Sequence, residues 1–163
     1  MTGPDETAPA ASGRPEAADE RRDAVPRAVV RWLLAVLFAV AGVGHFTAAE
    51  AFRAQVPPWM PWPEAVIAVS GVVELALAAA LAFAPRRHRP LVGWVTAAFL
   101  VAVFPGNVSQ YVTGTAAFGL ETDSARLVRL FLQPALVAAA LWSTGAWAAW
   151  RARRRAKGRR FRA

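Results

Sequence analysis

The sequence predicts an all-α protein, a bundle of four transmembrane helices. The chain has 163 residues, of which 56% are hydrophobic, and its hydrophobic residues gather in four long stretches. Each stretch has about the 20 residues that a helix needs to cross ~30 Å of hydrocarbon. Charged residues are rare in these stretches, and much of the net charge of +8 comes from residues 151–163. The predicted spans are 29–46, 64–84, 91–112 and 127–150.

The two ends of the chain differ from this apolar middle. Residues 1–26 contain few large hydrophobic residues, mixed charges and Pro4, Pro9, Pro15 and Pro26, which predicts a disordered tail. Residues 151–163 hold eight basic residues and no acid. We therefore expect one transmembrane domain over 27–150, a disordered tail before it and a polybasic tail after it.

The connection between the first two spans has two predicted parts. Thr47 and Glu50 have the spacing of a capping box, which predicts a short helix that begins there. The run PPWMPWP at 57–63 cannot form a regular helix interior. Its Trp59 and Trp62 are typical of the membrane interface. We expect a short interfacial helix and a Pro/Trp loop that serves as an anchor or, alternatively, as a lid.

The distribution of basic residues predicts the orientation. All Lys and Arg residues except Arg53, Arg126 and Arg129 belong to the two tails, the start of the first span or the second connection. Flanks rich in Lys and Arg stay in the cytoplasm. Both termini are therefore predicted to be cytoplasmic, which agrees with an even number of spans. The Ala-, Arg- and Pro-rich composition is typical of a bacterial protein, so we expect the plasma membrane.

Each span carries a polar residue that lipid disfavours. An ionisable group costs at least ~2.5–3.5 kcal/mol at a helix centre, so such groups usually face the bundle interior and mark a site. In the predicted orientation they share the outer half of the bundle, which predicts a polar cavity open to the outer side. The candidate ligand-binding residues are His45, Glu74, Asn107, Arg129 and Gln133.

Glu74 is the most informative of these residues. It lies ten residues after Glu64, which is about 15 Å along a helix and hence near the membrane centre. A carboxylate at that depth has to be paired or protonated. Arg129 is the expected partner, because a guanidinium binds a carboxylate with two hydrogen bonds. The pair would either fix helix register or take part in ligand binding or proton exchange.

The other candidates also have structural alternatives. His45 could be an acid, a base or a ligand contact, or a satisfied polar group at a helix end. Asn107 could instead satisfy a backbone carbonyl that Pro105 leaves without a donor. Gln133 could be an interhelical hydrogen-bonding residue.

Composition excludes several classes of chemistry. The chain has no cysteine, so disulfides, thiol redox catalysis and Cys-ligated metals are ruled out for it. Two histidines make a dedicated metal cage unexpected, and we expect no metal. The basic residues abut apolar spans, so anionic lipid and membrane orientation explain them better than nucleic acid does.

Five short motifs occur in the order found in one family of membrane proteins. Together they resemble the DoxX family of small bacterial membrane proteins. The resemblance covers about residues 31–142 and implies a four-helix transmembrane fold associated with redox systems, similar to a subunit of an archaeal thiosulfate:quinone oxidoreductase. The motifs are AGVGHF at 41–46, VPP at 56–58, SGVVE at 70–74, AVFPGN at 102–107 and VRLFLQ at 128–133.

Three functions compete at this stage. The first is a subunit or accessory of a membrane redox system that contacts a quinone, with a redox partner protein, and it predicts a gap beside the polar cluster that lipid can reach. The second is a carrier of protons or small molecules, which predicts a polar path from Glu74 toward 86–89. The third is a non-catalytic assembly factor with a fully packed core. A homo-oligomer is compatible with all three, and none requires the chain to be an enzyme by itself.

Overall fold

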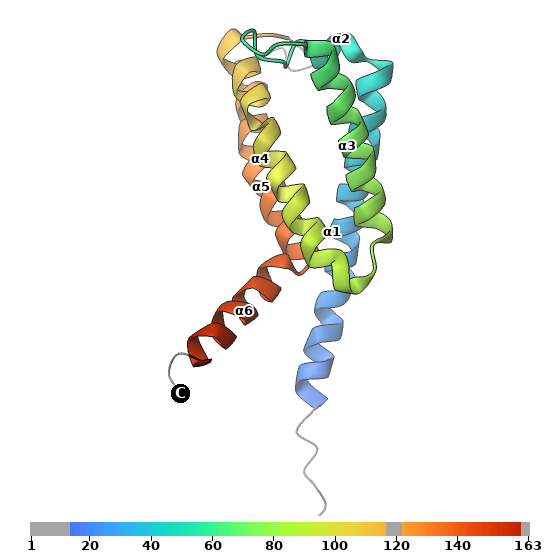
Figure 1. Ribbon diagram of the computed structural model, residues 1–163, viewed down its shortest axis with the longest axis vertical. Helices are drawn as coiled ribbons and strands as arrows, with labels where there is room; N and C mark the ends of the chain where they lie inside the picture. Colours follow the sequence, from blue (N-terminus) through green and yellow to red (C-terminus); the bar gives the residue numbers. More distant parts are fainter. Residues whose placement is uncertain (1–13, 117–121, 161–163) are drawn as a thin grey trace, which may run out of the picture.

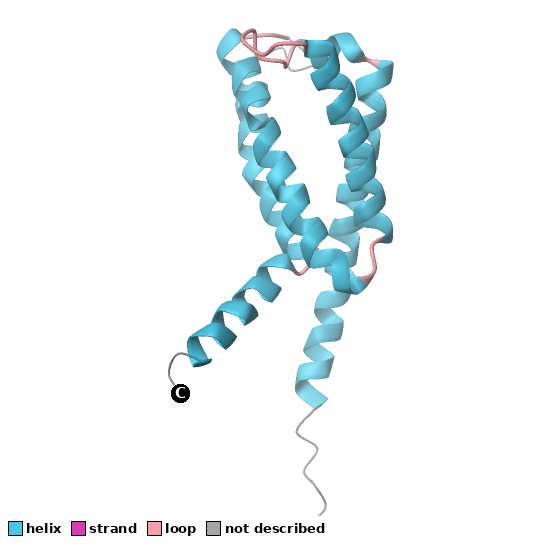
Figure 2. Cartoon of the chain, in the orientation of Figure 1, coloured by secondary structure: helices cyan, strands magenta, loops and turns pink. Residues whose placement is uncertain are grey.

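The computed structural model describes residues 14–116 and 122–160, and their regular structure is entirely helical (Figures 1 and 2). Four helices are long and apolar enough to cross a membrane, over Ala24–Thr47, Pro63–Phe83, Arg86–Thr113 and Asp123–Ser143. This confirms the all-α class and the four predicted spans. The elements are α1 (Arg14–Thr47), α2 (Ala49–Arg53), α3 (Pro63–Phe83), η1 (Arg86–His88), α4 (Arg89–Thr113), α5 (Asp123–Ser143) and α6 (Ala146–Arg160).

The long helices are arranged as two pairs. Helix α1 packs along α3, and α4 packs along α5. The pairs converge at the η1 end of the bundle and separate toward the α2 end (Figure 1). A buried apolar cluster joins them in the half nearer η1. It consists of Leu34, Ala35, Phe38, Leu77, Ala78, Leu81, Leu100 and Ala140.

Glycines allow α1 and α3 to approach closely. A Cβ atom on Gly71 would lie 2.7 Å from Cβ of His45, and one on Gly42 would lie 2.8 Å from Cγ of Leu75. Small residues at helix contacts are the usual means of close packing between transmembrane helices. The contact at Gly71 therefore sets the position of His45 relative to α3.

An arginine near the η1 end binds the last turn of α3. The side chain of Arg31 is buried and donates hydrogen bonds to the carbonyl oxygens of Leu81 and Ala82. Carbonyls in the last turn of a helix have no partner within the helix, and a cation there is favourable. Arg31 thus caps α3 from the neighbouring helix.

The first helix begins earlier than the sequence predicted. Helix α1 starts at Arg14, so 14–26 are helical instead of disordered, while 1–13 lie outside the described residues. The segment is rich in Ala, Glu and Arg, which are strong helix formers, and Pro15 stands in the first turn. The prediction weighed polarity and prolines and neglected this propensity.

The fourth span ends earlier than predicted, at Ser143 instead of at residue 150. Gly145 has φ of 73°, a left-handed conformation that ends a helix and is readily adopted by glycine. Helix α6 begins at Ala146 and leaves the bundle at an angle (Figure 1). Trp147 and Trp150 therefore belong to α6.

The predicted helix starts need two smaller corrections. The capping-box prediction was wrong, because Ala48 is the N-cap of α2 and Thr47 Oγ1 instead contacts the carbonyl oxygen of Val43 at 3.2 Å. The N-cap of α5 is Thr122, whose Oγ1 accepts a hydrogen bond from the backbone N–H of Ala125. The start of α2 thus shifts by one residue, and α5 begins at Asp123, four residues before the predicted span.

Candidate functional site

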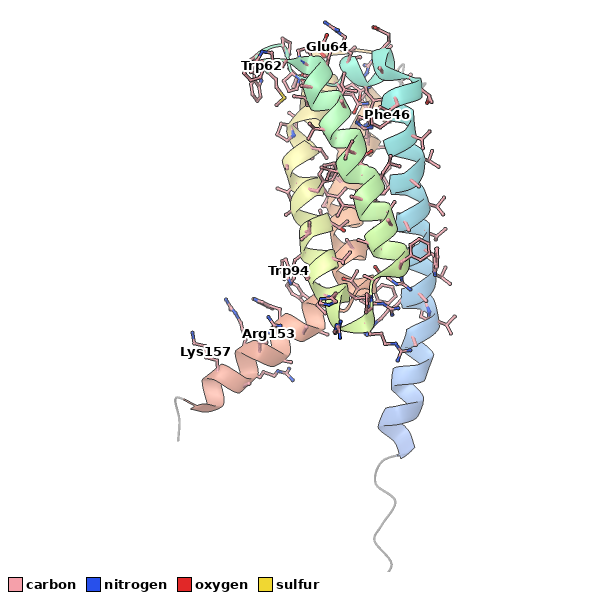
Figure 3. The ribbon with its side chains drawn as sticks, turned by 45° about the vertical axis from the view of Figure 1, so that its right-hand side comes forward. Phe46, Trp62, Glu64, Trp94, Arg153 and Lys157 are labelled. Carbon is pink, nitrogen blue, oxygen red and sulfur yellow. The ribbon has the colours of Figure 1, made fainter. Side chains whose placement is uncertain are left out.

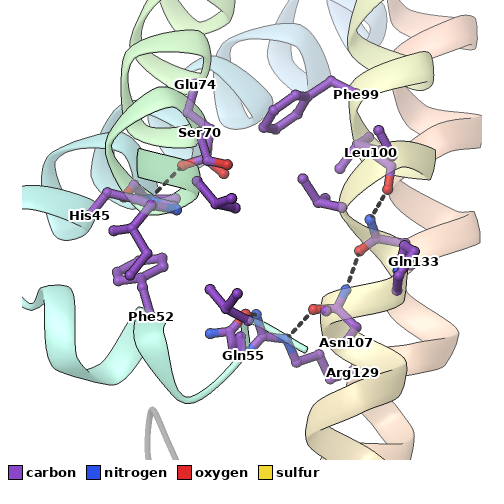
Figure 4. Close-up of a pocket in the computed structure, with 18 of the residues that line it drawn as sticks. His45, Phe52, Gln55, Ser70, Glu74, Phe99, Leu100, Asn107, Arg129 and Gln133 are labelled. Carbon is purple, nitrogen blue, oxygen red and sulfur yellow. Dashed lines mark hydrogen bonds and ion pairs between the residues drawn. The ribbon is translucent and has the colours of Figure 1, made fainter. Parts of the chain in front are cut away.

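A cavity of about 520 Å³ lies between the two helix pairs (Figure 4). Its walls come from all four long helices and from the segment that follows α2. All five candidate residues line it. They are His45 on α1, Glu74 on α3, Asn107 on α4, and Arg129 and Gln133 on α5. The structure thus brings the predicted residues together, and their role in binding stays a prediction.

One polar wall is formed by His45 and Glu74. Nδ1 of His45 lies 3.2 Å from Oε2 of Glu74 and 2.9 Å from the carbonyl oxygen of Ala41. The two side chains are 9% and 13% exposed. A carbonyl oxygen can only accept, and an ionised carboxylate likewise, so Nδ1 is best placed as the protonated nitrogen of the ring. The Phe52 ring packs on the imidazole at 3.7 Å between centroids.

The expected ion pair between Glu74 and Arg129 is wrong. The ion-pair partner of Glu74 among the described side chains is His45. The two side chains approach at ion-pair distance without good hydrogen-bond geometry, so Oε2 of Glu74 is a buried oxygen with acceptor capacity to spare. Glu74 and Arg129 sit on different helix pairs, with the cavity between them (Figure 4).

Arg129 lies on the opposite wall and binds side-chain amide oxygens. Its Nε donates to Oδ1 of Asn107 at 3.1 Å, and its Nη1 donates to Oε1 of Gln110 at 3.2 Å. Its Nη2 donates to Oε1 of Gln55 at 2.6 Å. These bonds hold the planar guanidinium group in one orientation at the α2 end of the cavity.

The same network continues down α4 and α5. Nδ2 of Asn107 donates to Oε1 of Gln133 at 2.9 Å, and Nε2 of Gln133 donates to the carbonyl oxygen of Leu100 at 2.5 Å. Gln133 therefore joins α5 to α4, as its structural alternative predicted. The Asn107 amide is engaged by side chains on α5, so this network explains its burial without the carbonyl freed by Pro105.

Between the two polar walls the cavity is mainly apolar. Aliphatic and aromatic side chains face it from every long helix, among them Leu37, Phe38, Phe99, Val103 and Leu136. Phe99 lies at the end of the cavity opposite Gln55 (Figure 4). This combination suits a ligand with a flat or apolar body and polar groups at two edges.

The sequence did not single out two residues of the site. Gln55 follows α2 and carries the contact to Arg129, and Ser70 lines the cavity beside Glu74. The sequence did contain a signal for Ser70, because it lies one turn before Glu74 on the same predicted helix. Gln55 lies in an irregular segment where no periodicity applies, so only the tertiary fold places it at the site.

Comparison with known proteins gives one match. A family model described as Domain of unknown function (DUF8561) matches residues 34–144, which include the four spans in large part and every candidate residue. Neither the curated proteins nor the solved structures contain a match.

Proposed function

The chain belongs to the family of the domain of unknown function DUF8561, and we propose that it is a multi-pass membrane protein that binds a quinone head group as a subunit or accessory of a membrane redox system. The observation that carries the proposal is the cavity with two opposed polar walls. His45 and Glu74 form one wall, and Arg129 with Asn107 forms the other.

A quinone head suits this arrangement chemically. Its two carbonyl oxygens point to opposite edges of a flat ring, and its tail is apolar. In the proposed complex, His45 is the imidazolium partner of Glu74, so its Nε2–H donates to one carbonyl, and the other carbonyl accepts from Arg129 and Asn107. The ring lies among the apolar side chains, near Phe99. The resemblance of the sequence motifs to the DoxX family supports the redox association.

An apolar ligand also needs a route from the lipid. Leu37 and Leu132 both line the cavity, yet they are 46% and 53% exposed on the bundle. Side chains that line a cavity and are also exposed support an opening of that cavity toward lipid. Such an opening would be the gap that a quinone site requires.

The proposal includes an orientation in the plasma membrane. Both termini are cytoplasmic, because basic residues crowd the tails and the η1 connection. The α2 end of the bundle then faces outward. Trp59 and Trp62 at that end are 72% and 78% exposed, as interfacial anchors would be.

The competing functions receive less support. A carrier needs a polar path from Glu74 toward residues 86–89, but the buried apolar cluster of α1, α3, α4 and α5 occupies that half of the bundle. An assembly factor with a fully packed core would lack a cavity of about 520 Å³.

Equilibrium binding in nanodiscs tests the proposal. Ubiquinone and menaquinone analogues with short tails are titrated into wild type, Glu74→Gln and His45→Ala. We expect each substitution to weaken binding about tenfold, which is about 1.4 kcal/mol. Glu64→Gln is the matched control, because Glu64 is on the same helix, exposed and paired with Arg53 outside the cavity. Folded wild-type protein that binds neither quinone would refute the proposal.

A further inference from the structure

A second hollow lies on the outer face of the bundle, where α4, α5 and α6 meet. It has a volume of about 790 Å³ and is lined mainly by apolar side chains. We name it the α5–α6 groove and define it by Val101, Phe104, Leu130, Phe131, Leu141 and the two tryptophans Trp142 and Trp147. It shares one lining residue, Gln133, with the cavity between the helix pairs.

A guanidinium group lies over the ring of each of the two tryptophans of the groove. The guanidinium carbon of Arg151 lies 6.0 Å from the ring centre of Trp147, and that of Arg27 lies 5.8 Å from the ring centre of Trp142. Indole rings favour the headgroup region of a bilayer, and guanidinium groups stack on them. One end of an apolar groove is thus marked by aromatic rings and positive charge.

Helix α6 strengthens the positive charge at this end. Its Arg151, Arg153, Arg154, Arg155 and Lys157 are exposed, and none of them forms an ion pair with a carboxylate among the described side chains. Figure 3 shows Arg153 and Lys157 on the part of α6 that projects away from the bundle. Only Arg151 of this set stacks on a tryptophan of the groove.

The groove is also long enough for lipid chains. The lining residues of α5 run from Leu127 to Trp142, which corresponds to about 22 Å of helix. One leaflet provides about half of the ~30 Å hydrocarbon thickness. An acyl chain that begins at the tryptophans can therefore lie in the groove over its whole leaflet depth.

We propose that the α5–α6 groove binds one anionic phospholipid, with its acyl chains on the apolar lining and its phosphate beside Arg151 and Arg27. The charge at the tryptophan end selects an anionic headgroup, and the groove selects a lipid over a soluble phosphate. This is a defined site for one molecule, in contrast to the diffuse attraction that any basic tail has for an anionic membrane.

Native mass spectrometry of the full chain tests the charge requirement. Protein in detergent is mixed with phosphatidylglycerol or phosphatidylcholine, and bound lipid is counted. We expect wild type to retain one phosphatidylglycerol and at least fivefold less phosphatidylcholine. Arg151→Gln should reduce phosphatidylglycerol at least fivefold. Arg154→Gln is the control, because Arg154 stacks on Trp150, which does not line the groove, at 4.4 Å.

A second pair of variants tests the groove itself without altering charge. Ala138 lines the groove, whereas Ala135 on the same helix is exposed outside it. Ala138→Phe should abolish retention of phosphatidylglycerol, and Ala135→Phe should retain it, with both variants checked for helix content by circular dichroism. Millimolar inorganic phosphate should leave the bound lipid in place.

Four results would overturn the proposal. Equal losses in Arg151→Gln and Arg154→Gln would show diffuse attraction. Equal retention of both lipids would show that charge is not recognised. Displacement by phosphate would show that the groove adds nothing. A dimer that forms through this face and excludes lipid would show that a second copy of the chain occupies the groove.

Discussion

Oε1 of Gln55 accepts a hydrogen bond of 2.6 Å from Nη2 of Arg129, and this contact joins the two helix pairs at the α2 end of the bundle. Gln55 follows α2, which lies beside α1 and α3, whereas Arg129 belongs to α5. The backbone carbonyl of Gln55 also lies against Gly106 of α4, where a Cβ atom would be 3.1 Å from it. The segment after α2 thus lines the α2 end of the cavity, and the opening of the cavity toward the outer side stays a prediction.

This contact should contribute measurably to stability. Hydrogen bonds to a charged group contribute about 1.5–3 kcal/mol in soluble proteins, and interhelical ones in membranes average about 0.6 kcal/mol. A double-mutant cycle of Gln55→Leu and Arg129→Met, measured by unfolding in SDS, should give a coupling free energy of about 1 kcal/mol. Gln55→Glu keeps an acceptor and should retain the stability that Gln55→Leu loses. Additive effects of the two substitutions would show that the contact does not link the helix pairs.

The close approach of α1 and α3 predicts a second result. In Gly71→Ala the new Cβ would lie 2.7 Å from that of His45, so the helices must shift apart. Overpacking of this kind costs about 1–3 kcal/mol, and it should also disturb the His45–Glu74 contact. SDS unfolding measures the loss. Gly158→Ala is the control, because no atom lies near a Cβ at that position in α6. Equal stability of the two variants would contradict the packing described here.

Capping of α3 by Arg31 gives a third prediction. Arg31→Met removes the donor to the carbonyls of Leu81 and Ala82 and leaves the helix end less satisfied. A cation at a helix C-terminus contributes up to about 2 kcal/mol where it is shielded from water, as Arg31 is, and we expect a loss of about that size. Hydrogen exchange should show faster opening of the last turn of α3. Arg86→Met changes an exposed arginine nearby and should leave this turn protected.

Single cysteines can test the orientation, because the chain contains no cysteine of its own. Trp59→Cys lies at the α2 end and should react with a membrane-impermeant maleimide added to intact cells. Arg86→Cys lies at the η1 end and should react only after the membrane is permeabilised. The reverse pattern would place both termini outside and would invert the proposed topology.

The sequence predicted the spans and the residues that line the cavity because both depend on local patterns. Long apolar stretches define the membrane helices whatever their packing. A polar residue in lipid is disfavoured on any face but the interior, so His45, Glu74, Asn107 and Gln133 were expected to face one another. The structure places all of them on one cavity.

Pairing within the site depends on tertiary geometry and was not predictable. The choice of His45 as the partner of Glu74 follows from the close contact of α1 and α3 at Gly71, and Arg129 is separated from Glu74 by the cavity. Only the fold brings Gln55 to Arg129. The sequence did contain a signal for the end of the fourth span at Ser143, which is the glycine at 145. The prediction extended the span past this glycine because the residues around it are apolar.

Photoaffinity labelling with an azidoquinone tests the central claim most directly. Wild-type protein in nanodiscs is labelled, and the modified residues are mapped by mass spectrometry. The account predicts saturable label on residues that line the cavity, such as Phe99 or Phe52, with competition by unlabelled quinone and a strong reduction in Glu74→Gln. Label spread over the outer faces of the helices, without saturation or competition, would contradict a quinone site between the helix pairs.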